Sequence, residues 1–210
     1  MNAYQTEQLD CLTMVLGHFE HHGASCLTAL ESMIYDYLDF RHQVTGFFKT
    51  HFESICTEKC YQNRLSACCA RDGIIAFFAD VVINAIVSSG TQLEELRTAI
   101  ISPYKPDKCI FLTETGCTWQ IKPVVCEFFL CDAAERQVFQ NDPDAQRRWE
   151  ILTAEKNAYT WPDRPVLFER IENEFIIRGC QSPLMYLHNS PGLVRIRRAR
   201  DRDPGLLQPQ

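Results

Sequence analysis

Apolar side chains recur every three to four residues through most of the chain, which is the period of an amphipathic α-helix. The first such stretch covers residues 4–22 and the second covers residues 26–52, with Gly23 between them. Glycine commonly ends a helix, because it adopts backbone conformations that other residues avoid. We therefore expect an antiparallel pair of helices joined at Gly23.

The most apolar stretch, residues 73–88, is hydrophobic on nearly all sides, which predicts a buried central helix. It is shorter than the ~20 residues that cross a bilayer, so we predict no membrane span. The next helix is expected to begin at Thr91, since Thr91 and Glu94 have the spacing of a capping box, and to end before Pro103.

The following region predicts a small β-hairpin, with apolar residues 109–112 on one strand and residues 117–119 on the other. Pro123 suits the first turn of a further helix. Cys131 lies five positions after Cys126, about 140° round a helix of 3.6 residues per turn. Cys131 is therefore expected either to face away from Cys126 or to lie at a break in the helix.

Two more helices are expected in the last third of the chain, one from about residue 143 to 159 and one from 166 to 178. Gly179 is predicted to cap the second. Residues 183–196 are expected to add a short strand or loop.

The pattern as a whole predicts a mostly α fold. Residues 1–194 are expected to form a single helical metal-binding domain with a small β-hairpin, organised around a cysteine core at 56–131. Residues 195–210 are expected to form a basic, disordered tail, since five arginines fall between positions 195 and 202. Such a tail could also contact nucleic acid or an acidic partner, which is the less favoured interpretation.

Cysteine is the unusual feature of the composition. The chain has eleven cysteines among 210 residues, fewer than the roughly 8–10% of a small disulfide scaffold. The first ten residues show neither the basic nor the apolar segment of a secretory signal, so we expect a cytoplasmic protein with reduced thiols. There, cysteine clusters more often bind metal or carry out redox chemistry. The net charge of −6 argues against nucleic-acid binding.

Eight cysteines fall into two blocks on either side of the central apolar stretch. The candidate metal ligands are Cys56, Cys60, Cys68 and Cys69 in the first block, and Cys109, Cys117, Cys126 and Cys131 in the second. We expect the two blocks to fold together around bound metal. Adjacent cysteines cannot point the same way from a regular helix or strand, so Cys68 and Cys69 are expected in a turn or with two different partners.

Thiolates are soft ligands that suit zinc and iron–sulfur clusters. Eight of them suffice for two 4Fe–4S clusters, or for one cluster with spare ligands. A zinc or mononuclear iron site is the alternative, although the gaps on either side of Cys117 exceed the short spacing of zinc fingers. The blocks match neither ferredoxin spacing, and the chain has no Cys-x-x-Cys motif of the thioredoxin kind.

Three segments of the second block carry a resemblance to a known family. They are Cys109-Ile-Phe-Leu, Gly116-Cys117-Thr-Trp and Lys122-Pro123-x-x-Cys126. They resemble the C-terminal pattern of the YkgJ-type zinc- or iron-chelating cysteine-cluster family, in which arginine is usual at the position of Lys122. The block that ends at Cys68-Cys69 resembles the first cluster of that family. The resemblance implies metal or iron–sulfur binding, and some relatives are linked to flagellin lysine methylation.

Three functions are compatible with these features. The first is an iron–sulfur protein that serves in electron transfer or as an accessory to a redox enzyme, with a protein partner. The second is a zinc-stapled helical interaction module. The third is a metal-dependent group-transfer enzyme of the methylase kind, with Lys122, Glu127 and Trp119 near the metal. The chain has no Gly-x-Gly-x-x-Gly loop, which weakens the third, and structural roles are favoured for these three residues.

The remaining candidates lie outside the two blocks. His18, His21 and His22 share one helical face, a spacing that could bind metal, but a solvated helix end is the favoured interpretation. Three further cysteines, Cys11, Cys26 and Cys180, fall on apolar helical or capping positions and are expected to be structural.

Overall fold

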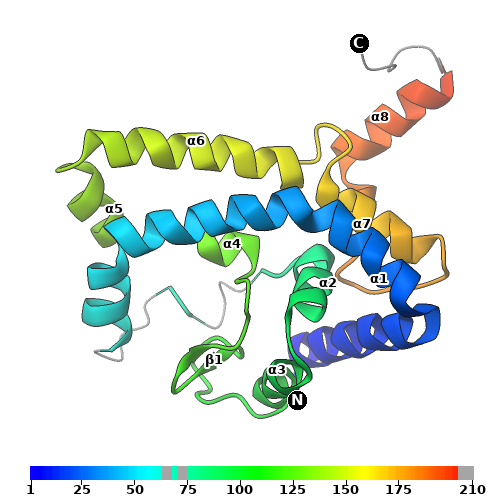
Figure 1. The fold of residues 1–210 in the computed structure, drawn as a ribbon, viewed down its shortest axis with the longest axis horizontal. Helices are drawn as coiled ribbons and strands as arrows, with labels where there is room; N and C mark the ends of the chain where they lie inside the picture. Colours follow the sequence, from blue (N-terminus) through cyan, green and yellow to red (C-terminus); the bar gives the residue numbers. More distant parts are fainter. Residues whose placement is uncertain (63–67, 71–74, 203–210) are drawn as a thin grey trace.

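The computed structural model describes residues 1–62, 68–70 and 75–202. They form a mostly helical fold with one two-stranded antiparallel sheet, which confirms the predicted mostly α fold with a small hairpin (Figure 1). The elements are α1 (Ala3–His51), η1 (Ser54–Tyr61), α2 (Phe78–Val87), α3 (Gly90–Ile101), β1 (Leu112–Thr113), β2 (Gly116–Cys117), α4 (Val124–Glu127), α5 (Asp132–Phe139), α6 (Pro143–Thr160), α7 (Leu167–Ile176), η3 (Leu187–Asn189) and α8 (Pro191–Arg202).

Helix α1 contains a sharp bend at Gly23, where the two predicted N-terminal helices meet. Gly23 has φ of 68° and ψ of −163°, a backbone conformation that L side chains rarely adopt. The halves of α1 diverge from this bend, and α2 packs against α1 between them (Figure 1). A capping box between Asn2 and Gln5 begins the helix.

Helix α2 is the centre of the fold, as its apolar sequence predicts. Its residues from Phe78 to Ala85 are all buried, and it packs against α1 and α7. The helix begins later than the predicted residue 73, because residues 75–77 are not helical and residues 71–74 lie outside the described ranges. At its start the Asp80 carboxylate accepts a hydrogen bond from the Phe77 backbone N–H at 2.9 Å.

The predicted start of α3 is wrong by two residues. Ser89, not Thr91, is the N-cap, and its hydroxyl accepts from the backbone N–H of Gln92 at 3.3 Å. The Gln92 side chain accepts in return from the Ser89 N–H at 2.8 Å. Thr91 and Glu94 lie inside the helix, because the extended backbone at Ser89 already completes a capping box.

The hairpin is confirmed, with Leu112 opposite Cys117 and Thr113 opposite Gly116. Pro123 is not in the first turn of the next helix: its ψ of 138° makes it the N-cap of the short helix α4. A break then separates α4 from α5, and Cys131 is the N-cap of α5. The break that the Cys126–Cys131 spacing suggested is therefore present.

Helix α6 runs along one side of the second half of α1, while η1, the hairpin and α4 lie on the other side (Figure 1). Phe128, two residues after Cys126, stacks on Phe40 of α1 with ring centroids 6.0 Å apart. It also stacks on Trp149 of α6 with centroids 4.9 Å apart. This aromatic layer fixes the end of α4 against two long helices.

The C-terminal region differs from expectation in one respect. Helix α7 is followed by Gly179 with φ of 80°, as predicted for a cap. The loop predicted at 183–196 is present only at residues 183–186, because η3 and α8 occupy most of the rest, and residues 195–202 are helical rather than disordered. Pro191 suits a first helical turn and the Leu193 side chain is buried, which together begin and fix α8.

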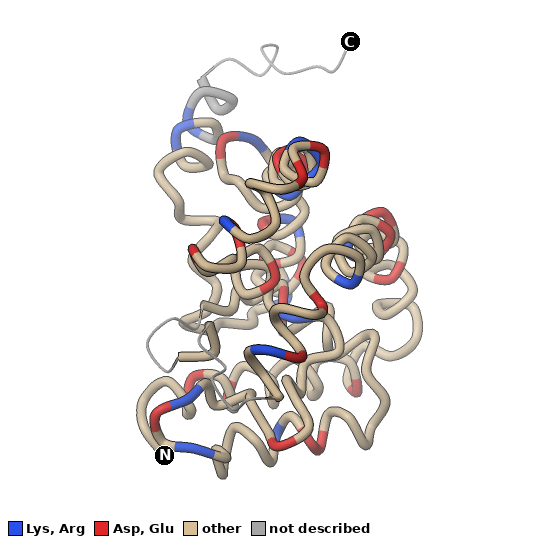
Figure 2. Tube along the Cα trace, turned by 90° about the vertical axis from the view of Figure 1, so that its left-hand side faces the viewer, with Lys and Arg blue, Asp and Glu red and all other residues tan. Residues whose placement is uncertain are grey.

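Acidic and basic residues are interspersed along the trace (Figure 2). Across the described residues, no helix is both long enough and apolar enough to cross a membrane. Residues 203–210 of the predicted tail lie outside the described ranges.

Candidate metal centre

Backbone pairing joins the two cysteine blocks directly. The Cys109 N–H donates to the Cys69 carbonyl at 3.0 Å, and Ala70 forms an antiparallel β-bridge with Lys108. A second link runs from η1 to the hairpin, where the Tyr61 hydroxyl donates to the Glu114 carbonyl at 2.5 Å. The two blocks, 40 residues apart between Cys69 and Cys109, thus form one region of the molecule.

Cys56 and Cys60 lie in η1, which is a π-helix of eight residues. Its i→i+5 hydrogen bonding is rare in proteins and is found frequently at functional sites. Burial, and after it the charges of Cys68, Cys131 and Cys60, raises the pKa of Cys56 to about 11. Cys131 therefore neighbours the first block in space, although it belongs to the second block in sequence.

The thiols of the adjacent residues Cys68 and Cys69 interact directly with each other. Cys68 lies in a turn, as predicted, and a hydrogen bond from the Cys69 thiol is the main reason why the pKa of Cys68 falls to about 6. The same hydrogen bond, with burial and the charges of Cys68, Cys109 and Cys117, raises the pKa of Cys69. The two thiols therefore contact each other, while Cys69 also faces the second block.

Backbone N–H groups point at the sulfurs of the second block. Burial raises the pKa of Cys109 to about 12, against the favourable effect of the nearby N–H groups of Phe111 and Leu112, of which the Leu112 N–H donates to the Cys109 carbonyl at 3.0 Å. Desolvation raises the pKa of Cys117, against a hydrogen bond from the Trp119 N–H. Such donors favour the thiolate over the thiol, and the thiolate is the form that binds metal.

Cys126 completes the set. Burial, followed by the charges of Cys117, Asp80 and Cys68, raises its pKa to about 11. From these interactions we assign the eight sulfurs to two groups of four, between which Cys68 also interacts with Cys126. The first group is Cys56, Cys60, Cys68 and Cys131, and the second is Cys69, Cys109, Cys117 and Cys126. The Cys68–Cys69 contact joins the two groups.

The sulfurs are neighbours without being at coordination distance. Within the described ranges, no three His, Cys, Asp or Glu side chains are placed closely enough to hold a metal ion as they stand. A metal would therefore have to draw its ligands together. The donor set itself fits soft metals, because it consists of thiols with N–H groups directed at two of them.

Helices α1 and α2 hold the segment that connects Cys117 to Cys126. Asn84 of α2 donates to the Ile121 carbonyl at 2.7 Å and accepts from the Ile121 N–H at 3.0 Å. Asp80, one turn earlier, accepts from the Val124 N–H at 3.1 Å. From α1, the Arg41 guanidinium donates to the Lys122 carbonyl at 2.6 Å. This segment is thus fixed from two sides by side chains of the core.

Charged side chains flank the second group of sulfurs. The Lys122 ammonium lies 3.8 Å from a Glu127 carboxylate oxygen, and the Arg41 guanidinium lies 3.9 Å from the same oxygen. Desolvation opposes the Lys122 charge, but Glu127 and the sulfurs of Cys117 and Cys69 raise its pKa overall. The Lys122 side chain is 54% exposed, which fits the surface charge expected of it, and its ammonium group lies near the second group of sulfurs.

A buried hydroxyl next to the sulfurs has no partner. The Tyr4 hydroxyl makes no hydrogen bond to any described residue. Burial first, then the charges of Cys109 and Cys126, raises its pKa. A buried O–H donor without an acceptor is uncommon in a folded protein. Its position beside two candidate ligands fits a site that gains an acceptor when a metal group is bound.

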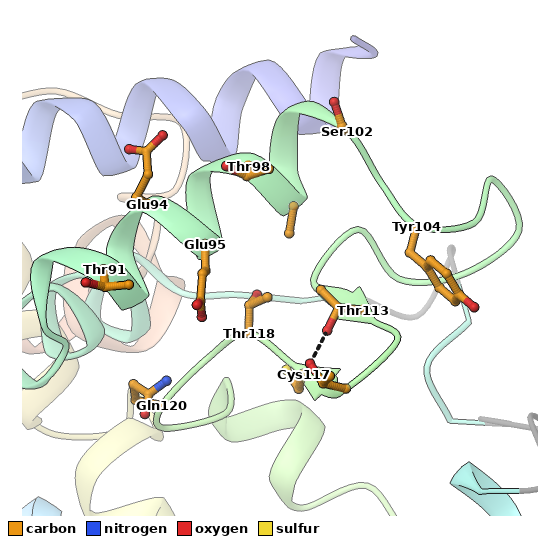
Figure 3. A pocket seen from close by; sticks show the side chains of 12 residues that line it. Thr91, Glu94, Glu95, Thr98, Ser102, Tyr104, Thr113, Cys117, Thr118 and Gln120 are labelled. Carbon is orange, nitrogen blue, oxygen red and sulfur yellow. Dashed lines mark hydrogen bonds between the residues drawn. The ribbon is translucent and has the colours of Figure 1, made fainter.

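Two cavities meet at Cys117. One of about 560 Å³ lies between α3 and the hairpin, where the Thr113 and Thr115 hydroxyls are hydrogen-bonded at 3.2 Å (Figure 3). The other, of about 380 Å³, lies between α1 and residues 119–122. Both give small molecules a route to the second group of sulfurs.

The other three cysteines lie elsewhere. Cys11 is buried, and burial raises its pKa to about 12, which fits the expected structural role. Cys26 and Cys180 lie 3.5 Å from the two ring nitrogens of His18. Contrary to the expected solvated helix end, His18 is buried, because the bend at Gly23 brings Cys26 back over it and Phe175 packs on its ring. His21 and His22 are exposed, as expected.

Sequence reasoning missed four residues of the region, namely Tyr4, Arg41, Asp80 and Asn84. A signal existed for three of them. Arg41 continues the apolar stripe of Ile34 and Tyr37, and Asp80 and Asn84 interrupt an otherwise apolar helix. A charge or amide at a core position needs a partner, which here is the backbone of the second block.

Comparison with known proteins adds no relative, since no family profile, curated protein or solved structure matches this chain.

Proposed function

We propose that the protein binds iron–sulfur clusters through its eight neighbouring cysteines and serves in electron transfer or as an accessory to a redox enzyme. The observation that carries this proposal is the backbone pairing of the two cysteine blocks, in which the Cys109 N–H donates to the Cys69 carbonyl at 3.0 Å and Ala70 bridges to Lys108. Four cysteines are the ligand set of a 4Fe–4S cluster. The resemblance of residues 109–126 to the YkgJ-type family supports the same reading.

The two groups specify which residues would hold each cluster. The first cluster would use Cys56, Cys60, Cys68 and Cys131, and the second would use Cys69, Cys109, Cys117 and Cys126. When bound, such clusters supply one-electron transfer at potentials set by hydrogen bonds to sulfur and by solvent exposure. The N–H groups of Phe111, Leu112 and Trp119 would tune the second cluster.

Zinc is the second candidate metal. The exposed apolar side chains of the C-terminal half favour the function that goes with zinc, a zinc-stapled interaction module. Trp161 and Ile177 are 59% and 72% exposed. Apolar side chains of this size on the surface suit contact with a protein partner. A zinc-stapled core would then act as the frame of an interaction module.

Anaerobic purification followed by analysis of iron, acid-labile sulfide and zinc tests the proposal. About eight irons and eight sulfides per chain, with a broad visible absorption band, are expected for two 4Fe–4S clusters. About two zinc ions per chain, without iron or sulfide, would contradict the electron-transfer function and support the zinc-stapled interaction module. A preparation with neither metal, under conditions that load other iron–sulfur proteins, would sink both versions.

A further inference from the structure

Three side chains outside the metal centre meet where α1 bends back towards the end of α7. His18 and Cys26 lie on the two sides of the bend at Gly23. Cys180 follows Gly179, just after the end of α7. The Cys26 sulfur lies 3.5 Å from Nε2 of His18, and the Cys180 sulfur lies 3.5 Å from Nδ1. Each thiol therefore contacts its own nitrogen of one imidazole.

The imidazole between the two thiols is held in place and uncharged. His18 is 6% exposed, and Phe175 of α7 packs on its ring with centroids 4.2 Å apart. Burial first, and then the charges of His22 and Arg178, lowers the pKa of His18. A neutral imidazole has one donor nitrogen and one acceptor nitrogen. The two thiols therefore have different roles, since one gives a hydrogen bond to the ring and the other accepts one from it.

Only one of these two cysteines lines a cavity of about 310 Å³ at the end of α7. Cys180 and His188 belong to its lining, and Cys26 does not. Ile176 and Met185 supply an apolar part of the lining, which suits a short hydrocarbon chain. Cys180 is partly exposed. Burial raises the pKa of Cys180, so its sulfur keeps its proton until a base removes it.

The second imidazole of this cavity is oriented by a buried carboxylate. Glu172 is 1% exposed, and its carboxylate accepts from Nδ1 of His188 at 2.8 Å. It also accepts from the backbone N–H groups of Leu187 at 3.1 Å and His188 at 2.8 Å. A carboxylate at Nδ1 makes Nε2 the basic nitrogen of the neutral ring. The cavity thus combines a thiol that has a base in contact with it and a second imidazole in a set orientation.

We propose that Cys180 accepts an acyl group from a small thioester bound in this cavity. His18 carries its proton on Nε2, directed at Cys26, and Nδ1 takes the thiol proton as the Cys180 sulfur attacks the carbonyl carbon. One C–S bond forms, the C–S bond of the thioester breaks, and the leaving thiolate takes the proton from His18. Thiol, base and a third group that orients the base are the parts of an activated nucleophile.

The choice of a thioester follows from the chemistry of the nucleophile. An acyl group passes between two sulfur atoms with little change in free energy, because one C–S bond replaces another. The proposal goes beyond metal binding, and it gives Cys180 a role other than the structural one expected from the sequence.

Acetylation of the full chain by S-acetyl-N-acetylcysteamine, a small acetyl thioester, tests the proposal, with site-resolved mass spectrometry as the readout. Cys180 should be acetylated faster in the folded protein than in the chain unfolded in urea, although folding partly buries it. It should also react faster than Cys26. A reaction at Cys180 that folding slows, or a faster reaction at Cys26, would overturn the proposal. Metal content is not the readout, so this result is separate from that of the metal analysis.

Four variants assign the reactivity to these side chains. His18→Gln should slow acetylation of Cys180 about a hundredfold, the usual contribution of a general base. His42→Gln, at an exposed histidine of α1, should leave the rate unchanged. Cys26→Ala should slow the reaction severalfold, and Cys26→Ser should restore it, since serine keeps an acceptor for the Nε2 proton. Equal rates in natural protein and His18→Gln, or in the two Cys26 variants, would refute the assignment.

Discussion

The eleven cysteines occupy two regions that differ in what surrounds the sulfur. The eight candidate ligands lie in short elements between residues 54 and 131, including a π-helix, a turn and a hairpin. The other three, Cys11, Cys26 and Cys180, lie in α1 or just after α7. Inside an α-helix the backbone N–H groups are already bonded to carbonyl groups. Short elements leave N–H groups free to reach sulfur, as Phe111 and Trp119 do.

The neighbours of the two sets also differ. In the first region, Cys56 and Cys69 interact with neighbouring sulfurs, and Lys122 interacts with Cys69 and Cys117. In the second, Cys26 and Cys180 flank the imidazole of His18, and Cys11 interacts with Ser182. The comparison teaches that local backbone structure, rather than cysteine count, separates candidate ligands from the other thiols.

The largest expected effect is loss of metal from one region only. Cys109→Ala should remove about half of the bound metal, because one group of four loses a ligand while the other stays complete. Cys56→Ala should remove the other half. Cys26→Ala is the matched control and should retain all of it. Metal analysis of the three variants checks this, and a control that loses as much metal as Cys109→Ala would erase the distinction between regions.

The next effect concerns Arg41 of α1, which holds the region of the eight candidate ligands in place. Arg41→Met should lower the free energy of unfolding by about 3–5 kcal/mol, because it removes a buried cation beside Glu127 and a donor to the Lys122 carbonyl. Arg148→Met, on the exposed surface of α6, should change it by less than about 0.5 kcal/mol. Urea unfolding of both variants measures the difference. Equal values would show that Arg41 does not support the region.

Asp80 makes the free energy of unfolding depend on pH. Burial is the main cause that raises the Asp80 pKa to about 6, against hydrogen bonds from the Phe77 and Val124 N–H groups and the charge of Arg41. The folded protein thus keeps a proton that the unfolded chain releases near pH 4. The resulting stabilisation is full below pH 4 and is lost as the pH rises through 6.

Asp80→Asn cannot titrate, so it isolates this contribution. The stability of the natural protein relative to Asp80→Asn should fall by about 3 kcal/mol between pH 4 and pH 7, since each pKa unit is worth about 1.36 kcal/mol. Denaturant midpoints at four or five pH values measure the change. A difference that stays constant with pH would show that Asp80 ionises normally in the folded state.

The smallest effect is expected at Tyr4. Tyr4→Phe removes a buried hydroxyl that lacks a partner, so metal-free protein should be unchanged or more stable by up to about 1 kcal/mol. Metal-loaded protein should instead lose stability, since the hydroxyl then has an acceptor beside Cys109. Thermal unfolding of both forms, with Tyr35→Phe as an exposed control, separates the two cases. Loss of stability in metal-free protein would contradict this role.

Much of the fold follows from local sequence signals. The bend at Gly23, the hairpin before Cys117 and the cap at Gly179 all follow from residue type and spacing. The start of α3 was missed because Ser89 and Gln92 form a capping box that competes with Thr91 and Glu94. Helix α8 was missed because its arginine-rich sequence gives little sign that the Leu193 side chain is buried.

The candidate site was predictable as a set of residues but not as an arrangement. Spacing selected the eight cysteines, and it predicted that Cys68 and Cys69 lie in a turn or serve two different partners. It could not place Cys131 beside Cys56, because that proximity depends on how α4, α5 and η1 pack. The supports from Arg41 and Asn84 also depend on tertiary contacts across more than 30 residues of chain.

Residue-resolved thiol labelling of anaerobically purified protein, before and after chelation, tests the central claim most directly. Labelling followed by mass spectrometry reports on each of the eight candidate ligands and on Cys11, Cys26 and Cys180. The account predicts that chelation exposes the cysteines of both sequence blocks together, including Cys131 with Cys56, and leaves the other three unchanged. Protection that changes in one block alone, or equally at all eleven cysteines, would contradict it.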